Sequence, residues 1–392
     1  MSPRDVETLQ YKCNLMPLTP IQIGSGNEIS PFEYVIKNNE YFRIDINEVI
    51  EKFPLNIKKE YIKTLEEKSM FSSRKFLKNY YKKEYGFIYK CPISEDFIKL
   101  YDEKIGGSKN KNEDNQLTIF EFIGNYKGKY IPGSTLKGAI RSAYLMENFT
   151  SDDFYKITRE IKNSRGRKNP TKPFKSVLNK NIVMRKIESR ILELEEFDPK
   201  FDPFKNFKIS DTKINNDLIE VKQIFRKGIK KEKCILMPMG CFEVTKSVFG
   251  SNESIELEFE INIKNIFGDT EEKIIKLSKR KSVSIVKEST AFYLEDKGIL
   301  EYLNNKSEKV LKEDIEFFEK IGDKKLLDIC QKLLAYREKL DENQALIRIG
   351  RGIGFNSTTL NLCNEKKESV FTRVTVDDMP IGWALITCKE NL

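Results

Sequence analysis

Apolar and polar residues alternate along several stretches of this chain, and a period of two residues predicts β-strands. The clearest alternation runs from Ile255 to Ile263, where three glutamates and an asparagine separate the apolar residues. Such a strand has one face in the core and one face in solvent. The segment Tyr11 to Leu15 alternates in the same way and leads into the loop Ile23-Gly24-Ser25-Gly26. We therefore expect a strand that ends in a glycine-rich turn.

Other patterns complete the expected set of elements. Residues 33–36 and 41–46 flank Asn38-Asn39 and predict a β-hairpin. Helical spacing extends over residues 47–85 and 273–340. Further strands are expected at Leu117 to Ile123, Cys234 to Met237, Cys241 to Val244, Phe371 to Val376 and Trp383 to Ile386. Short strands interspersed with helices favour an α+β fold over a doubly wound sheet.

The segment Ile131-Pro132-Gly133-Ser134-Thr135-Leu136-Lys137-Gly138-Ala139-Ile140-Arg141 carries a strand through a Pro-Gly turn into a helix. The first N–H groups of a helix are unsatisfied, and the partial positive charge there favours a phosphate. We expect Ser134 or Thr135 to cap the helix and Lys137 and Arg141 to share one face. The alternative is a plain turn before an amphipathic helix that packs in the core. The segment is not a Walker A loop, because its lysine precedes the glycine.

The end of the first helical region interleaves aromatic and basic residues. They are Phe71, Arg74, Lys75, Phe76, Lys78, Tyr80, Tyr81, Lys82, Lys83 and Tyr85. This mixture suits single-stranded nucleic acid, in which bases stack and phosphates pair with cations. An amphipathic helix with aromatic residues in the core and lysines in solvent has the same pattern. Both interpretations stay open from the sequence.

Three glycines at alternate positions, Gly350, Gly352 and Gly354, lie beside Arg348 and Arg351. Glycine lets the backbone approach a ligand closely, and arginine supplies charge. The spacing differs from the dinucleotide fingerprint GxGxxG, and no βαβ unit surrounds it.

Composition narrows the class of protein. With 392 residues, of which 39% are hydrophobic, we expect two or three structural units. The absence of an apolar run of about 18 residues and of an apolar N-terminal core predicts a cytoplasmic protein without a membrane segment. The seven cysteines have no CxxC spacing, which predicts reduced thiols and no zinc site. They are Cys13, Cys91, Cys234, Cys241, Cys330, Cys363 and Cys388.

The chain contains no histidine. Histidine is the usual general base near neutral pH and the commonest metal ligand. Ser-His-Asp, Cys-His and HExxH chemistries are therefore excluded. Catalysis by carboxylate, lysine or tyrosine stays possible, but no pair of residues points to it, and we expect neither a catalytic residue nor a metal or other cofactor.

The formal net charge of +9 is concentrated in one window. Between Lys156 and Arg190 the chain has twelve basic residues, among them Arg165, Arg167 and Lys168, against two acids. This window therefore carries the whole excess of positive charge. It is expected to be a partly mobile insertion that meets a polyanion, and the alternative is a solvated charge run.

Taken in order, four segments resemble the RAMP superfamily of CRISPR proteins. They are Leu18-Thr19-Pro20-Ile21-Gln22-Ile23-Gly24-Ser25-Gly26, the segment 130–141, Lys208-Ile209-Ser210-Asp211, and Ile349-Gly350-Arg351-Gly352-Ile353-Gly354. Within that superfamily, the length, the long middle insertion and the closing segment from Thr372-Arg373 to Pro380-Ile381-Gly382-Trp383 are similar to the fifth Csm subunits of type III-A effector complexes.

The resemblance implies an RRM-like or ferredoxin-like core with an antiparallel sheet and insertions. Residues 1–150 would form the N-terminal part of the core, with a helical insertion at about 47–101. Residues 151–232 would be the basic insertion, and residues 233–392 the C-terminal part, with a second helical insertion at about 271–341.

The resemblance also implies a function. Such subunits cap a filament of backbone subunits at the 3′ end of the CRISPR RNA (crRNA), do not catalyse, and support 3′-end maturation, with a recruited host nuclease. Partners would be crRNA, target RNA, and neighbouring backbone and small subunits of the Csm complex. By this resemblance the residues along the RNA path would be Gly24, Ser25, Gly26, Gly133, Ser134, Thr135, Lys137, Gly350, Gly352 and Gly354. The positive charge of the motifs and of the basic window adds Arg141, Arg165, Arg167, Lys168 and Arg351 to the expected RNA-binding residues.

Two departures from the family pattern bear on catalysis. Gln22 stands where relatives often have histidine, and residues 27–33 contain no aspartate of the kind with which sister subunits cleave target RNA. An endoribonuclease that processes CRISPR RNA precursors is the nearest alternative function. A metabolic enzyme that binds a nucleotide at the glycine loops is a more distant one.

Overall fold

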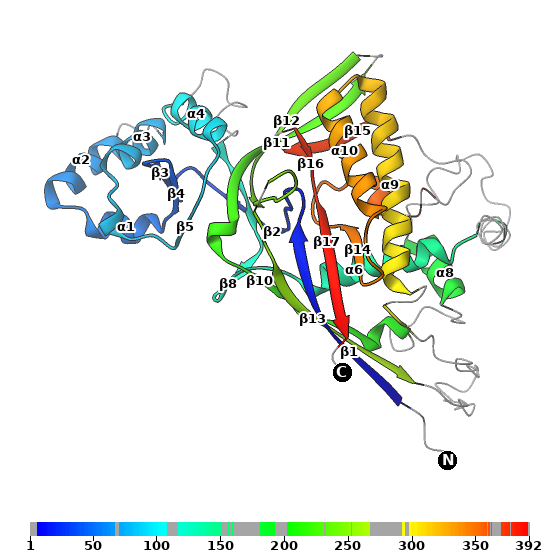
Figure 1. The fold of residues 1–392 in the computed structure, drawn as a ribbon. Coiled ribbons are helices and arrows are strands. Elements are labelled where there is room, and N and C mark those ends of the chain that lie inside the picture. Colours follow the sequence, from blue (N-terminus) through cyan, green and yellow to red (C-terminus); the bar gives the residue numbers. More distant parts are fainter. Residues whose placement is uncertain are drawn as a thin grey trace, which may run out of the picture.

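The computed structural model describes residues 6–66, 70–107, 117–150, 156, 159, 181–192, 202–230, 233–251, 253–266, 292–294, 298–358, 360, 362, 370–376 and 378–390. Within these residues the chain forms several mostly antiparallel β-sheets with helices packed against them, a mixed α+β fold (Figure 1). None of the described helices is long and apolar enough to cross a membrane.

The central sheet has five antiparallel strands and brings both ends of the chain together. Its order is β14 (Gln344–Arg348), β17 (Trp383–Glu390), β1 (Val6–Pro17), β13 (Leu257–Ile266) and β9 (Phe207–Ile209). The predicted alternation in β13 is confirmed, because Leu257, Phe259 and Ile261 are buried and Glu258 and Glu260 are exposed.

A second sheet stands beside the first. Its order is β16 (Met379–Pro380), β15 (Thr372–Val376), β11 (Ile219–Lys230), β12 (Lys233–Thr245), β6 (Ile119–Phe122) and β2 (Gly24–Ile29). A three-stranded sheet comprises β10 (Thr212–Ile214), β8 (Gly128–Ile131) and β7 (Gly124–Asn125). Strands β9, β10 and β11, which run between Phe207 and Lys230, lie inside the range 151–232 that the resemblance assigns to the basic insertion, and they belong to the sheets.

Helices pack around the two larger sheets, and α6 and α9 contact strands β9 and β14 of the central sheet. The described helical elements outside the small module are α6 (Gly133–Glu147), α8 (Asn181–Ile191), α9 (Ile299–Ile321) and α10 (Lys324–Arg337), with the short elements η4 (Pro203–Asn206), η5 (Asn216–Leu218) and α11 (Phe355–Thr358). Helix α9 packs on α6, α10 and the edge strand β14. Asn304 of α9 donates to the Gln344 carbonyl and accepts from the Leu346 N–H, at 3.0 and 2.9 Å. The side chain thus satisfies the exposed backbone groups of an edge strand.

A smaller module has its own core and lies to the left in Figure 1. It contains β3 (Tyr34–Lys37), β4 (Glu40–Arg43), β5 (Tyr89–Cys91), α1 (Ile46–Lys52), α2 (Leu55–Glu66), α3 (Met70–Tyr80), η1 (Lys83–Tyr85) and α4 (Glu95–Lys104). The predicted hairpin is confirmed, and Asn38 and Asn39 in its turn have φ of 53° and 58°. Both residues adopt the left-handed conformation that a two-residue hairpin turn requires.

Most aromatic residues at the end of the first helical region are buried in the core of the module, whereas Tyr80 is exposed. Phe76, Tyr81 and Tyr85 are buried, and Tyr80 stacks on Phe76 with ring centroids 4.2 Å apart. Lys78 pairs with Asp102 at 2.5 Å. Of the two interpretations of this mixture of aromatic and basic residues, the structure favours packing in the core.

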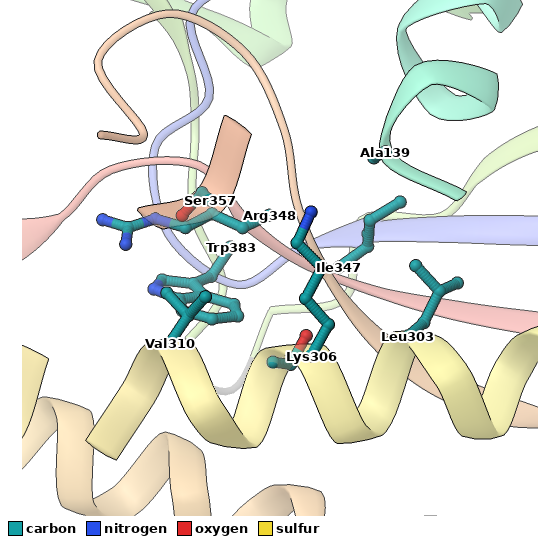
Figure 2. A pocket seen from close by; sticks show the side chains of 9 residues that line it. Ala139, Leu303, Lys306, Val310, Ile347, Arg348, Ser357 and Trp383 are labelled. Atoms are coloured by element: carbon teal, nitrogen blue, oxygen red, sulfur yellow. The ribbon is translucent and has the colours of Figure 1, made fainter. Parts of the chain in front are cut away.

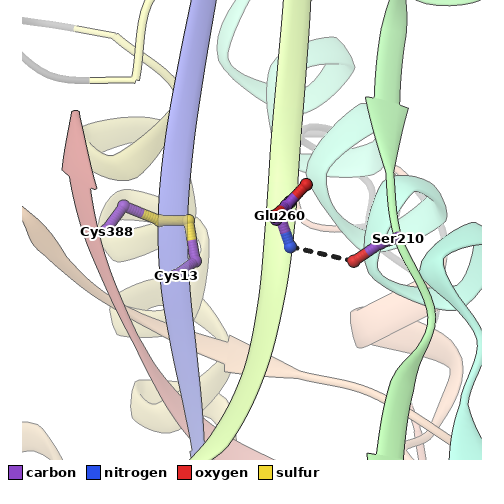
Figure 3. Close-up of a disulfide and its surroundings, with 4 residues drawn as sticks. All are labelled: Cys13, Ser210, Glu260 and Cys388. Atoms are coloured by element: carbon purple, nitrogen blue, oxygen red, sulfur yellow. Dashed lines mark hydrogen bonds between the residues drawn. A yellow bond between two sulfur atoms is a disulfide. The ribbon is translucent and has the colours of Figure 1, made fainter. Parts of the chain in front are cut away.

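One expectation about the cysteines is wrong. Cys13 of β1 and Cys388 of β17 lie opposite each other in the central sheet and form a disulfide, shown in Figure 3. Their separation of 375 residues hides the pairing from sequence spacing. In the described part of the chain Cys91, Cys234, Cys241 and Cys330 form no disulfide, as expected. Burial raises the pKa of Cys91, Cys241 and Cys330, which keeps these thiols protonated.

Candidate functional site

A cleft of about 330 Å³ lies where the three glycine-rich segments of the sequence meet. Gly24 comes from the start of β2, Thr135 from the first turn of α6, and Gly350 and Arg351 from the loop after β14. The remaining lining residues are Ile23, Gly138, Ala139, Ser142, Arg348, Ile349, Ile353, Ser357 and Thr358. Segments more than 300 positions apart in the sequence therefore form one concave surface of a size typical of ligand sites.

Buried hydrogen bonds fix the first glycine segment, residues 18–26, to the neighbouring strands. The Thr19 hydroxyl accepts from the Trp383 N–H at 2.9 Å, and the Thr245 hydroxyl accepts from the Ile21 N–H at 3.0 Å. Gln22 is fully buried and donates from Nε2 to the Glu121 carbonyl at 3.4 Å. Gly24 is exposed, so the chain leaves the core at this residue and enters the cleft wall.

Ser25 is tied to a buried network of charges. Its hydroxyl donates to Glu121 at 3.1 Å and accepts from the Asn27 N–H at 3.0 Å. Lys129 pairs with Glu121 at 3.3 Å and with the fully buried Glu243 at 2.9 Å. Gly26 follows with φ of 92° and open space around its Cα. The network fixes the strand and leaves Gly26 facing solvent.

Tyr89 completes the network by donating from its hydroxyl to Glu243. Burial, together with the charge of Glu243, raises the pKa of Tyr89, so the phenol stays protonated. Burial opposes ionisation of Glu121, but the Lys129 charge and hydrogen bonds from Asn27 and Ser25 outweigh it and lower the pKa of this carboxyl. The Glu121 carboxyl is therefore held in its ionised form. Both oxygens of Glu121 and both oxygens of Glu243 accept hydrogen bonds within the fold.

The second segment begins α6, but neither Ser134 nor Thr135 caps it. Pro132 occupies the N-cap position without a side-chain hydrogen bond, so this expectation is wrong. The Gly133 N–H donates to the Asp211 carboxylate at 2.8 Å. A Cβ at Gly133 would meet the Ile209 carbonyl oxygen at 2.2 Å. Gly133 is thus required for packing against β9, and an internal carboxylate occupies part of the expected phosphate position.

Lys137 and Arg141 have different environments although they share a helix face. Arg141 donates two hydrogen bonds to Asp202 at 2.9 and 2.8 Å and one to Glu188 at 3.0 Å. Its charge is neutralised within the fold. Lys137 has no hydrogen-bond or ion-pair partner among the described residues, and burial lowers the pKa of its ammonium group. Lys137 is therefore the cation of this helix that is free to meet a ligand.

The third segment docks on the first. The Arg351 N–H donates to the Gln22 carbonyl at 2.6 Å, and a Cβ at Gly350 would meet that same oxygen at 2.4 Å. Only glycine fits there with its φ of 97°. Gly352 and Gly354 also have positive φ, and the space around Gly354 is open. The Arg351 guanidinium stacks over the Phe120 and Phe242 rings, at 4.5 and 5.1 Å.

Arg348 forms the floor of the cleft and belongs to a buried cluster. Its Nη1 donates to Asp314 at 2.8 Å, its Nε donates to the Ile381 carbonyl at 3.0 Å, and its guanidinium lies 5.1 Å from the Trp383 ring. Arg373 binds the other oxygen of Asp314. The sequence motif draws attention to Arg348, but nothing in the sequence links it to Asp314 or Arg373.

Other predictions fall outside this cleft. Arg165, Arg167 and Lys168 lie outside the described residues. The outward positions of the central strands β1 and β13 carry no aromatic side chain in their described length, so this face lacks the stacking platform of an RRM. No group of three cysteine, aspartate or glutamate side chains suited to a metal ion occurs in the part of the chain that the structure describes.

Comparison with known proteins adds to this geometry. The model of the RAMP superfamily matches residues 14–357. The CRISPR system Cms protein Csm5 of Methanocaldococcus jannaschii is 28% identical over 262 residues, which are 65% of this chain and 54% of that protein. The chain therefore spans about half the length of the curated relative it matches.

Two solved structures share the fold. A chain in the structure titled "Cryo-EM structure of Csm-crRNA-target RNA ternary complex in type III-A CRISPR-Cas system" has a TM-score of 0.62 at 19% identity, covering 98% of this chain and 100% of that one. The crystal structure of T. onnurineus Csm5 has a TM-score of 0.59 at 19% identity, covering 95% of this chain and 99% of that one.

Proposed function

Because this chain belongs to the RAMP superfamily, we propose that it is a crRNA-binding subunit of a type III-A Csm complex that does not itself catalyse. In this role it caps the backbone filament at the 3′ end of the crRNA and supports 3′-end maturation, with a host nuclease as a recruited partner. Its other partners are the neighbouring backbone and small subunits and the target RNA, and its location is the cytoplasm. The similarity to Csm5 and to a chain of a Csm-crRNA-target RNA complex supports this proposal.

The meeting of three glycine-rich segments at one cleft is the observation that carries the proposal. Glycine backbones let a polyanion approach closely. Arg351 supplies a cation in the cleft lining, and Lys137 supplies one on α6 outside that lining. Contacts of this kind read the backbone of a nucleic acid and ignore its sequence. Single-stranded RNA is therefore the proposed ligand.

The charge pairing of Arg141 changes the role that we assign to it. Since Asp202 and Glu188 hold its guanidinium, Arg141 positions α6 against the described part of the chain that follows it. Lys137 is the RNA-binding cation of this helix. The rest of the proposed contact surface is Gly24, Ser25, Gly26, Thr135, Gly350, Arg351, Gly352 and Gly354, with Ser134 exposed beside it.

Co-purification tests the proposed assembly. The chain is expressed with its genomic neighbours and a CRISPR array, and it should elute in a large complex that carries an RNA of defined length. A free monomer without RNA would contradict the proposal. Incubation of the purified chain with repeat-containing RNA should leave that RNA intact, whereas site-specific cleavage would favour an endoribonuclease.

Titration with single-stranded RNA tests the cleft. Affinity should fall steeply between about 50 and 200 mM salt, because phosphate contacts release counterions. Lys137→Ala should lower the slope of log K against log salt by about 0.7 and leave the melting temperature unchanged. Lys90→Ala is a matched control on the small module, where the lysine pairs with Glu40 at the surface. Equal slopes for the two variants would remove Lys137 from the RNA path.

A further inference from the structure

A small cavity of about 10 Å³ lies next to the cleft, between α6, α9 and the end of β14. Figure 2 shows Arg348 stacked over Trp383, with the Ser357 hydroxyl beside the guanidinium stem. Arg348, Ser357 and Ala139 line both the small cavity and the cleft. These three residues therefore form the partition between the two spaces, and Arg348 and Ser357 are its polar members.

The cluster beneath the partition has more positive than negative charge. Arg348 and Arg373 share one carboxylate, Asp314, and the side chains of all three residues are at least 94% buried. Among the described residues Asp314 is the sole ion-pair partner of either guanidinium. A buried net charge of this kind is costly unless an anion compensates it.

Hydrogen-bonding groups remain available at the same point. A guanidinium has five N–H donors, and Arg348 uses Nε and Nη1 within the described fold. Its Nη2 has no partner among the described residues. The Ser357 hydroxyl is buried and also lacks a hydrogen-bond partner there, although Ser357 lines the cleft. A planar guanidinium with free donors and a serine hydroxyl are a suitable pair for a tetrahedral oxyanion.

We propose that Arg348 and Ser357 form a phosphodiester-binding subsite at the floor of the cleft. The ligand is one backbone phosphate of the single-stranded RNA, so its identity rests on the proposed function. Asp314 and Trp383 are positioning residues, because they orient the guanidinium and do not line the cleft. The subsite would fix the register of the RNA between the α6 turn and the glycine loop.

Four variants test the subsite. Ser357→Ala removes a hydroxyl that the fold does not use, so it should leave the melting temperature unchanged and weaken single-stranded oligouridylate binding about fivefold, the equivalent of one hydrogen bond. Arg348→Gln should weaken it more and lower the salt slope by about 0.7. Arg373→Gln is the matched control, since Arg373 contacts the same carboxylate but does not line the cleft. Ser247→Ala, also outside the cleft lining, controls for serine loss.

The second readout is thermal stabilisation by inorganic phosphate against chloride at equal ionic strength. Phosphate should raise the melting temperature of the wild type and of Arg373→Gln more than that of Ser357→Ala or Arg348→Gln. If wild type binds RNA and Ser357→Ala binds it equally well with the same phosphate response, the subsite is wrong and the proposed function stands. If wild type binds no RNA but shows the selective phosphate response, the subsite stands and the proposed function is wrong. Absence of both responses overturns both.

Discussion

Two buried charge clusters, one bonded to the first glycine segment and one that includes Arg348 before the third, are built differently. Beneath the first glycine segment, Lys129 sits between Glu121 and Glu243, so acids outnumber bases. Beneath the third segment, Asp314 sits between Arg348 and Arg373, so bases outnumber acids. In the first cluster the acceptors are saturated by Ser25, Asn27, Tyr89 and backbone N–H groups. In the second, donors remain free.

The difference separates a scaffold from a binding surface. A network in which every group is satisfied gains nothing from a ligand and holds the backbone in one place. A cluster with an excess of one charge and unpaired donors gains when a counter-charged group arrives. The saturated hydrogen bonds hold the β2 side in place, and the unsaturated β14 side is where we propose that an anion binds.

The largest effect is expected when Lys129, the base at the centre of the first cluster, is replaced. Lys129→Met leaves Glu243 buried and unpaired, which should lower the free energy of unfolding by about 3–5 kcal/mol, measured by urea denaturation. Lys90→Met removes an exposed lysine paired with Glu40 and should cost no more than about 1 kcal/mol. Equal losses for the two variants would show that the Lys129 cluster does not hold the fold.

The arginine cluster should tolerate the loss of one base better. After Arg348→Gln or Arg373→Gln, Asp314 keeps the other guanidinium, so each variant should lower the free energy of unfolding by about 2 kcal/mol. Denaturation of the two variants side by side measures this. A loss as large as that of Lys129→Met would mean that both arginines are needed for folding and that neither is spare.

Lowering the pH should reduce the stability that the Lys129 cluster provides, because Glu121 becomes protonated. The folded-state pKa of this carboxyl lies below its unfolded value, so its contribution to stability is present above the unfolded pKa and is lost as pH falls through the folded pKa. Glu121→Gln should therefore be less stable than wild type above about pH 5, and the gap should narrow in more acidic solution. Urea midpoints of both proteins across this range measure the gap. A gap that stays constant with pH would contradict the assigned ion pair.

The smallest effect is expected for a substitution of Ser25, and it tests whether this side chain serves the fold or the ligand. Ser25→Ala removes one hydrogen bond to Glu121 and one from the Asn27 N–H, which should cost about 1 kcal/mol in the free energy of unfolding. RNA affinity should change less than in Ser357→Ala, because the Ser25 hydroxyl is already used by the fold. A larger loss of RNA affinity than in Ser357→Ala would place the ligand on the β2 wall instead.

Local patterns were enough to predict most of the fold. Period-two alternation located β1 and β13, the Asn38-Asn39 pair located the hairpin, and helical spacing located α9 and α10. The three glycine segments that line the cleft were also evident, because glycine-rich turns are recognisable in short windows. The resemblance to the RAMP superfamily used these segments together with Lys208 to Asp211, and the family model matches residues 14–357.

Pairings between distant residues were not accessible in this way. The Gly133 N–H donates to Asp211, the charge of Arg141 is neutralised by Asp202, and Cys13 bonds to Cys388. Each depends on which strands and helices become neighbours, and no spacing rule encodes that. The aromatic residues of α3 illustrate the same point, since exposure separates a stacking surface from a core.

The sequence by itself determined the elements, the three glycine segments and the lack of histidine chemistry, because these follow from local propensity and residue type. Only the tertiary structure decided which cations are free. Lys137 and Arg141 look equivalent along the helix, yet two carboxylates hold Arg141 and none of the described residues holds Lys137. Arg348 likewise gains its significance from Asp314 and Arg373. The physical reason is that charge is a property of a residue, whereas its compensation is a property of the fold.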